Sequence, residues 1–307
     1  MFRSRHSQAV KMTSLGILGD WGSTRLRLWR LEDGRVTDRR EGPGVIGLQR
    51  PPADVLLEAL APWRTAGASR ITLCGMAGAR GGLHEADYAP CPVDAAQWAE
   101  RTVAFALDGL SVRIAAGCAH DRGGGFRDLM RGEETQLFGA MALNPALAAG
   151  RHLLILPGTH SKWAVVDGGR IVDFRTFLTG ELFARLRGSS LLPDPADVPG
   201  DDAAFAAGVE ASGNGGLLGN LFLTRSAQVD GGRSGEWASA FLSGLLIGSE
   251  CAEMIGTVPP SSPVRILGAP GLAERYAAAL GRFGTGAERL EADACTLAGL
   301  RMIDVDD

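Results

Sequence analysis

The chain has 307 residues, of which 45% are hydrophobic, so it is long enough for two lobes that each bury a core. Its 31 basic and 35 acidic residues leave a formal net charge of −4, which excludes a global positive field that would recruit nucleic acid. The five cysteines are odd in number and form no C-x-x-C pair, which argues against a disulfide framework or a zinc ribbon and favours the reducing cytoplasm.

The N-terminal segment is basic but does not read as a signal peptide. No uninterrupted apolar region ending at a small-residue cleavage site follows residues 1–12. We therefore expect residues 1–14 to form a disordered tail, with Met12 as the alternative start of the native chain.

A β-hairpin follows this tail. Residues 15–20 form a short apolar run that ends in Asp20, a turn follows, and residues 25–31 alternate in the manner of a strand before Asp33 and Gly34 close the hairpin. A carboxylate at a strand end can hold a hydrated magnesium ion, while the N–H groups and hydroxyls of the turn contact phosphate oxygens. The residues expected to act in this way are Asp20, Gly22, Ser23 and Thr24, although an ordinary hairpin turn would show the same pattern.

A second glycine-rich turn follows a short predicted strand at residues 71–73, after a predicted helix at residues 52–64. The segment CGMAGAR would bring the backbone close to a ligand, and a sugar-acid pocket is one use of it. A planar guanidinium matches a carboxylate in two-point contact, whereas an arginine in an ordinary ion pair is the alternative. The candidate substrate-binding residues are Gly75, Met76, Gly78, Arg80 and Arg175.

Two adjacent carboxylates open the amphipathic helix predicted at residues 132–143. The helix dipole stabilises an anion at this end, so either Glu133 or Glu134 could accept the proton of a substrate hydroxyl. The alternative is that both acids only complement the dipole.

A second hairpin repeats the first roughly 135 residues later, a spacing that is typical of a duplicated domain rather than a solenoid. Residues 153–156 are apolar, a Pro-Gly-Thr-His turn follows, and residues 162–166 again alternate like a strand. Two facing lobes would bring both turns to one phosphoryl group. The second turn supplies the candidates Gly158, Thr159, His160 and Lys162.

The last third of the chain is predicted to contain helices at residues 236–255, 271–283 and 291–303, and a surface loop at residues 188–202. The first of these helices is apolar, but Glu250 and Glu253 interrupt it, so we expect a buried helix with small residues that permit close packing rather than a membrane span.

Before the second of these helices, residues 265–275 read as a strand, a Gly-Ala-Pro-Gly turn and a helix. Its small residues would let an adenine or ribose ring lie against the backbone at Gly268, Ala269 and Gly271, although a plain strand-to-helix turn is the alternative.

Several of these segments together resemble one family. ILGDWGSTRLRLWR, CGMAGARGG, MRGEETQLFGA, LPGTHSKWAVVDGGRIVDFRTFLTGEL and FLSGLLIGSE are similar to 2-dehydro-3-deoxygalactonokinases, members of the sugar kinase, heat-shock ATPase and actin superfamily. The resemblance implies an α/β fold of two actin-like (ribonuclease H-like) lobes related by duplication, with the active site in the cleft between them. It implies an N-terminal lobe at residues 15–138 and a C-terminal lobe at residues 139–307, whose last helix could return to pack against the N-terminal lobe.

The same resemblance implies a reaction and its ligands. ATP would phosphorylate the 6-hydroxyl of 2-dehydro-3-deoxy-D-galactonate with Mg²⁺ held at Asp20, and Glu133 would be the first choice of base and Glu134 the second. The enzyme would act in the cytoplasm on a small sugar acid and would bind neither nucleic acid nor a membrane. A homodimer is one possible oligomeric state.

This sequence departs from the superfamily pattern at two places. Leu156 and Pro157 stand where many relatives carry an acid. Glu133-Glu134 stands where many relatives carry an aspartate base, so Asp121 and Asp128 remain alternative candidates for the base. The Glu-Glu pattern also resembles exopolyphosphatases. The alternatives are therefore a kinase for another sugar acid, a polyphosphate hydrolase, or a nucleotide-dependent binding protein without turnover.

Overall fold

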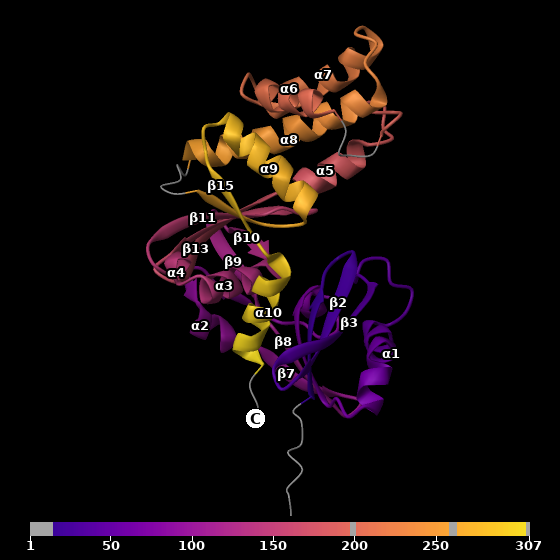
Figure 1. The fold of residues 1–307 in the computed structure, drawn as a ribbon, viewed down its shortest axis with the longest axis vertical. Coiled ribbons are helices and arrows are strands. Elements are labelled where there is room, and N and C mark those ends of the chain that lie inside the picture. The colour runs from indigo at the N-terminus through magenta and orange to yellow at the C-terminus, as the bar shows by residue number, and fades with distance from the viewer. Residues whose placement is uncertain (1–14, 197–200, 258–262, 305–307) are drawn as a thin grey trace, which may run out of the picture.

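The structure is a computed structural model, and it describes residues 15–196, 201–257 and 263–304 (Figure 1). The predicted tail of residues 1–14 lies outside the described residues. The described chain has a mixed α/β fold with two six-stranded sheets and one three-stranded sheet.

The first sheet is built on the N-terminal hairpin. Its strands in sheet order are β3 (Arg35–Pro43), β2 (Arg25–Glu32), β1 (Leu15–Trp21), β4 (Arg70–Gly75), β8 (Leu110–Ile114) and β7 (Val103–Leu107). Helix α1 (Pro52–Thr65) buries Leu56, Leu60 and Trp63, and these side chains belong to the same apolar cluster as the inner residues of β1, β4 and β8. The amphipathic helix therefore covers one face of the sheet.

The second six-stranded sheet repeats this plan. Its strands in sheet order are β15 (Ala287–Leu290), β14 (Val264–Leu267), β11 (Arg151–Leu156), β12 (Ser161–Asp167), β13 (Arg170–Phe177) and β6 (Val93–Asp94). In each sheet the first strand of the hairpin pairs antiparallel with the strand that follows it and parallel with a later strand, β4 or β14. The predicted duplication is confirmed at the level of topology.

A small three-stranded sheet, whose strands alternate in sequence with strands of the two larger sheets, had no counterpart in the predicted elements. Its strands are β10 (Phe126–Met130), β9 (Gly117–Gly123) and β5 (Tyr88–Pro90), and the short helices η1 (Met76–Gly78) and α2 (Ala95–Ala99) precede β9. Strand β10 leads directly into α3 (Glu133–Leu143), which α4 (Pro145–Ala148) follows. The small sheet therefore positions the start of α3.

A group of helices covers the side of the second sheet that is turned away from the first sheet, at the top of Figure 1. They are α5 (Thr179–Leu186), α6 (Asp202–Ser212), α7 (Leu217–Val229), α8 (Gly235–Thr257) and α9 (Pro270–Arg282). Helix α8 is long and apolar enough to cross a membrane, but 78% of its apolar window is buried within the protein, as expected for a core helix.

Small residues allow α8 to pack closely on α6, as the sequence predicts. A Cβ added at Gly244 would lie 2.0 Å from the Phe205 carbonyl oxygen, and one at Gly248 would lie 2.9 Å from Val209 Cα. Helices α6 and α7 were not among the predicted elements, and the predicted loop at residues 188–202 lies partly outside the described residues.

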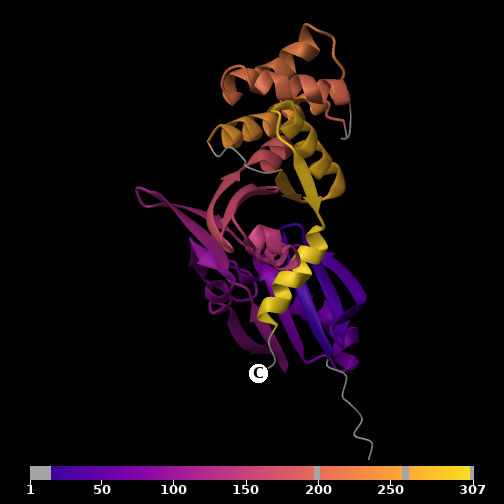
Figure 2. The same cartoon turned by 60° about the vertical axis from the view of Figure 1, so that its left-hand side comes forward.

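The last helix, α10 (Ala292–Ile303), lies against α3, β1 and β4, away from the group of helices α5 to α9 (Figure 2). Its C-terminal neighbour Asp304 accepts a hydrogen bond of 2.8 Å from Thr72 Oγ1 on β4. This contact joins the end of the chain to the first sheet. The division of the chain between residues 138 and 139 stays a prediction.

Candidate active site

A cleft of about 440 Å³ opens where the two hairpin turns, the start of α3, the β14–α9 turn and the start of α10 meet. The predicted residues that line it are Asp20, Gly22, Ser23, Thr24, Met76, Glu133, Gly158, Thr159, His160, Lys162, Gly268 and Ala269. Residues from both duplicated units, far apart in the sequence, therefore face one space.

The first turn is held in shape by the loop that follows β3. The N–H groups of Val45 and Ile46 donate to the carbonyl oxygens of Gly22 and Ser23 at 3.1 and 3.0 Å. Gly44 must be small because an added Cβ would lie 2.2 Å from the Ser23 carbonyl oxygen. These contacts fix the backbone of the turn at the cleft.

Asp20, the penultimate residue of β1, lies at the wall of the cleft and is paired with Arg27, which lies directly opposite on β2. Burial raises the pKa of the Asp20 carboxyl, and the positive charge of Arg27 opposes that shift. Arg27 also donates to Asp293 on α10 at 2.5 Å, so one guanidinium joins both carboxylates.

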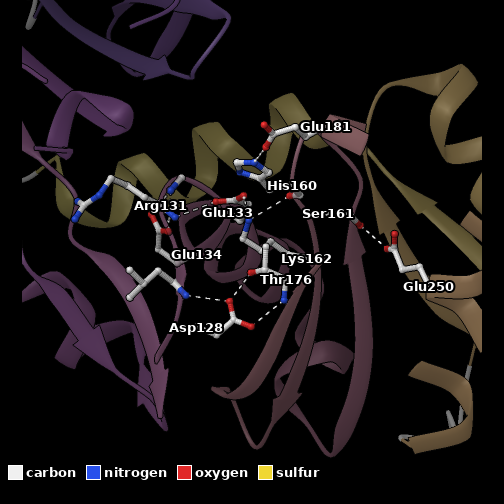
Figure 3. Close-up of polar contacts among 12 residues, drawn as sticks. Asp128, Arg131, Glu133, Glu134, His160, Ser161, Lys162, Thr176, Glu181 and Glu250 are labelled. Atoms are coloured by element: carbon white, nitrogen blue, oxygen red, sulfur yellow. Dashed lines mark hydrogen bonds and ion pairs between the residues drawn. The ribbon is translucent and has the colours of Figure 1, made fainter. Parts of the chain in front are cut away.

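The second turn is held by α5. The Glu181 N–H donates to the Thr159 carbonyl oxygen at 2.9 Å, and a Cβ added at Gly180 would lie 2.3 Å from the Gly158 carbonyl oxygen. The Glu181 side chain reaches back to His160 Nε2 at 2.7 Å, and this contact lowers the pKa of the Glu181 carboxyl (Figure 3). The first turn of α5 therefore orients a cleft side chain.

Glu133 and Lys162 form an ion pair of 3.1 Å between the start of α3 and strand β12 (Figure 3). The Lys162 side chain is only 4% exposed, whereas that of Glu133 is 25% exposed. Glu133 also accepts the Arg131 N–H at 3.0 Å, and Lys162 donates to the His160 carbonyl oxygen at 3.1 Å. A carboxylate and a cation thus stand side by side at the centre of the cleft wall.

Glu134 does not line the cleft. Its two carboxyl oxygens accept from the Gly132 N–H at 2.9 and 2.8 Å, and one of them also accepts from Thr135 Oγ1 at 3.1 Å. Burial and the nearby charge of Glu133 raise the pKa of Glu134 to about 8. The expectation that the helix dipole keeps this carboxyl ionised at neutral pH is wrong, because desolvation outweighs the hydrogen bonds.

The glycines of the predicted sugar-acid segment serve packing. Gly75 has a φ of +79°, and an added Cβ would lie 2.7 Å from the Trp21 carbonyl oxygen. A Cβ at Gly78 would lie 2.8 Å from Nη1 of Arg131, whose guanidinium stacks on Tyr88 at 4.2 Å. Of the predicted substrate residues, Met76 alone contributes to the cleft lining.

The remaining predicted substrate residues and the reserve acids lie away from the cleft. Arg80 is exposed and does not line it, and Arg175 instead pairs with Glu253 of α8 at 2.6 Å. Asp121 and Asp128 do not line it either. Asp128 accepts from the N–H and the hydroxyl of Thr176 at 2.9 and 2.5 Å, which joins β10 to β13 (Figure 3).

The β14–α9 turn separates two cavities. Gly268 and Ala269 line the cleft, whereas Gly271 lines a second cavity of about 680 Å³ between α6 and α9. Ala269 lines both, so the cavities meet at this turn. Pro157 packs 3.1 Å from the position of a Cβ at Gly268, which places the β14–α9 turn directly beside the second hairpin turn.

Sequence reasoning missed Arg27, Arg131, Tyr88 and Gln136, all of which line the cleft. A signal existed for Arg27, because the hairpin register places it opposite Asp20. Arg131 belongs to the segment MRGEETQLFGA, but nothing in the sequence pairs it with Tyr88, which the small sheet brings beside it.

A model of the 2-keto-3-deoxy-galactonokinase family matches residues 20–303. The chain belongs to this family. It is 37% identical over 300 residues to a probable 2-dehydro-3-deoxygalactonokinase of Rhizobium meliloti (strain 1021), covering 94% of this chain and 97% of that protein. It is 35% identical over 298 residues to the 2-dehydro-3-deoxygalactonokinase of Escherichia coli (strain K12), covering 95% and 98%.

Solved structures agree with the family assignment. A crystal structure of a protein assigned as a 2-dehydro-3-deoxygalactonokinase from Sinorhizobium meliloti superposes with a TM-score of 0.84 at 37% identity, over 94% of this chain and 95% of that one. The activator of the 2-hydroxyisocaproyl-CoA dehydratase from Clostridium difficile shares the fold at a TM-score of 0.52 and 12% identity, over 95% of each chain. The predicted α/β fold of two actin-like lobes is confirmed.

Proposed function

We propose that this kinase transfers the γ-phosphoryl group of ATP to the 6-hydroxyl of 2-dehydro-3-deoxy-D-galactonate. The observation that carries the proposal is the meeting of both hairpin turns and the Glu133–Lys162 pair in one cleft. Phosphoryl transfer needs positioning and charge stabilisation more than covalent chemistry, and this arrangement supplies both. The names of the curated relatives support the choice of acceptor.

The nucleotide would bind with its phosphates between the two turns. The backbone and hydroxyls of Ser23 and Thr24 offer hydrogen bonds from one side, and the Gly158-Thr159 turn offers them from the other. The adenosine would pass the Gly268-Ala269 turn toward the cavity between α6 and α9, since the two cavities share Ala269. That cavity is large enough for a base and lies on the second unit alone.

Asp20 would hold Mg²⁺ together with phosphate oxygens and water. Among the residues that the structure describes, no three His, Cys, Asp or Glu side chains cluster as a metal site. Magnesium suits such a place, because it is commonly bound by one or two carboxylates, substrate phosphates and water. The ion would neutralise charge on the transferring phosphoryl group.

Glu133 would accept the proton of the sugar hydroxyl, and Lys162 would contact the transferring phosphoryl group. A lysine ammonium is a compact charge that suits a phosphate oxygen. The side of the cleft formed by Met76, Tyr88 and Arg131 would receive the sugar acid. The acceptor hydroxyl would then lie between the base and the nucleotide tail. Glu134, which keeps its proton at neutral pH, would not act as the base.

We further infer that the enzyme acts in the cytoplasm on a small sugar acid, because all five cysteines are free, as a reducing compartment would keep them. The testing experiment is a coupled ADP-release assay that offers 2-dehydro-3-deoxygalactonate and its gluconate epimer in parallel. We expect turnover that depends on the galactonate compound, with a lower kcat/KM for the epimer. ADP release without any acceptor would instead indicate a hydrolase, and ATP binding without turnover would indicate a binding protein.

A further inference from the structure

A buried carboxylate behind the second hairpin turn takes no part in the chemistry proposed above. Glu250 of α8 is 2% exposed and accepts hydrogen bonds from four side chains. Ser161 Oγ lies at 2.6 Å, Trp163 Nε1 at 2.5 Å and the Tyr276 hydroxyl at 2.9 Å, and Thr179 Oγ1 is the fourth donor. Each carboxyl oxygen therefore receives two donors.

Two of these donors belong to the strand that leaves the turn. Ser161 and Trp163 alternate with Lys162 along β12, so they face α8 while Lys162 faces the cleft. Ser161 is also the residue directly after His160 of the turn (Figure 3). The carboxylate of Glu250 consequently holds the backbone that carries both cleft side chains.

The third donor belongs to the element that supports the turn from the other side. Thr179 is the first residue of α5, directly before Gly180 and Glu181. Those two residues contact the carbonyl oxygens of Gly158 and Thr159. Glu250 therefore ties the start of α5 to the start of β12, with the turn between them.

The fourth donor extends the network toward the nucleoside side. Tyr276 lies on α9, and the turn before that helix contributes Gly268 and Ala269 to the cleft. One carboxylate thus connects the three elements that would hold the phosphates and the nucleoside.

All four donors are neutral, and within the described part of the chain no ion pair offsets the cost of burying this carboxyl, so burial raises the pKa of Glu250. An apolar side chain of similar volume would avoid that cost. The carboxylate instead fixes the positions of four donor groups relative to one another, because its four hydrogen bonds converge on one side chain.

We propose that Glu250 is a positioning residue that sets the second phosphate turn, residues 158–160, against α5 and α9 for binding of the nucleotide tail. This proposal rests on the proposed function. Glu250 would contact neither ATP nor the sugar acid and would act through Ser161, Thr179 and Tyr276.

The test is Glu250→Gln, which keeps the shape but turns one acceptor oxygen into an amide donor. ADP binding by calorimetry needs no acceptor sugar, so it stays informative even where the proposed acceptor is wrong. We expect the Kd for ADP and the KM for ATP to rise roughly tenfold, with the KM for the sugar acid within about twofold. An ADP Kd within about twofold of wild type, with only a lower Tm, would overturn the proposal.

The matched control is Ser249→Ala on the same helix, because Ser249 Oγ donates to the Leu245 carbonyl oxygen of α8 at 2.7 Å and to no other group among the described residues. This variant should leave the Kd for ADP and the KM for ATP unchanged. Should Glu250→Gln fail to fold, Thr179→Val removes a single donor at nearly constant shape. It is expected to weaken ADP binding in the same direction, and an unchanged ADP Kd in that variant would contradict the proposal.

Discussion

Glu133 and Glu134 are neighbours in sequence but differ in environment. Glu133 faces the cleft and pairs with Lys162, whereas Glu134 turns into the protein and accepts from the Gly132 N–H. Successive residues of a helix point about a quarter turn apart, so one carboxyl reaches the cleft and the other the core. The environment, rather than the residue type, decides which of the two can accept a proton.

Glu133→Gln should lower kcat by roughly 10²–10⁴-fold, because the variant keeps the shape of the side chain but removes the proton acceptor. Nucleotide affinity should change by no more than a few-fold. Steady-state kinetics and ADP calorimetry check both numbers. Glu58→Gln on α1, where the side chain pairs with Arg50 on the surface, is the control and should be silent. Near-normal turnover of Glu133→Gln would remove Glu133 as the base.

Glu134 should make stability depend on pH. Burial raises the pKa of this carboxyl from 4.5 to about 8, so between these values the folded protein keeps a proton that the unfolded chain has lost. The contribution of Glu134 to the free energy of unfolding is therefore full at low pH and is lost as pH rises to about 8. Between these pKa values the free energy of unfolding falls by on the order of 1 kcal/mol per pH unit.

Urea unfolding of wild type and Glu134→Gln across pH 5–9 measures this difference. The glutamine cannot ionise and keeps an oxygen for the Gly132 N–H. The free energy of unfolding of the variant should therefore increase relative to that of wild type as pH rises. A constant difference across this range would contradict the raised pKa.

Two helices that lie about 150 residues apart in the sequence set the position of the base. Helix α3 carries Glu133 at its start, and α10 packs along it with Ala292 at the cleft. The packing is close because glycines lie on both sides. A Cβ at Gly139 would lie 1.8 Å from the Cys295 carbonyl oxygen, and one at Gly299 would lie 2.0 Å from the Thr135 carbonyl oxygen.

Gly299→Ala should destabilise the protein by about 1–3 kcal/mol, because the added methyl group meets backbone that cannot move aside. It should also lower kcat, since the displaced partner is the first turn of α3. Gly219→Ala on α7 is the matched control: no described residue lies within 4 Å of its Cβ position, so the change should be neutral or slightly stabilising. Thermal unfolding and kcat of both variants check this, and equal stabilities would refute the packing argument.

At the scale of the molecule, two sheets of the same plan contribute facing turns to one cleft. We expect the lobes to close on nucleotide and acceptor together, which would align the reacting groups and exclude water. Small-angle scattering should show a smaller radius of gyration with a non-hydrolysable ATP analogue, Mg²⁺ and sugar acid than with the acid alone. At ~100-fold excess over Kd, ligand binding should also stabilise the fold by about 2.7 kcal/mol.

The two measurements separate binding from closure. A higher Tm with an unchanged radius of gyration would mean that the nucleotide binds without movement of the lobes. No change in either would mean that this cleft does not bind the nucleotide under the conditions used.

Local sequence patterns predicted much of the fold and of the cleft lining. Both hairpins, α3, α8, α9 and α10 lie where apolar alternation and helical periodicity indicate. The turns are visible in sequence because glycine, serine and threonine adopt their backbone geometry and supply their donors. The small sheet escaped notice because β5 has only three residues and β10 is largely exposed, so these strands carry little apolar alternation.

The sequence by itself determined both hairpins, most of the long helices, the duplication and the family, because backbone periodicity and turn chemistry are local properties of the chain. Tertiary structure alone decided which charges meet. Lys162 on strand β12 pairs with Glu133 on helix α3, Arg175 pairs with Glu253 outside the cleft, and Glu134 is buried. Ion pairing and desolvation depend on distance and burial in space, and residue order fixes neither until the chain has folded.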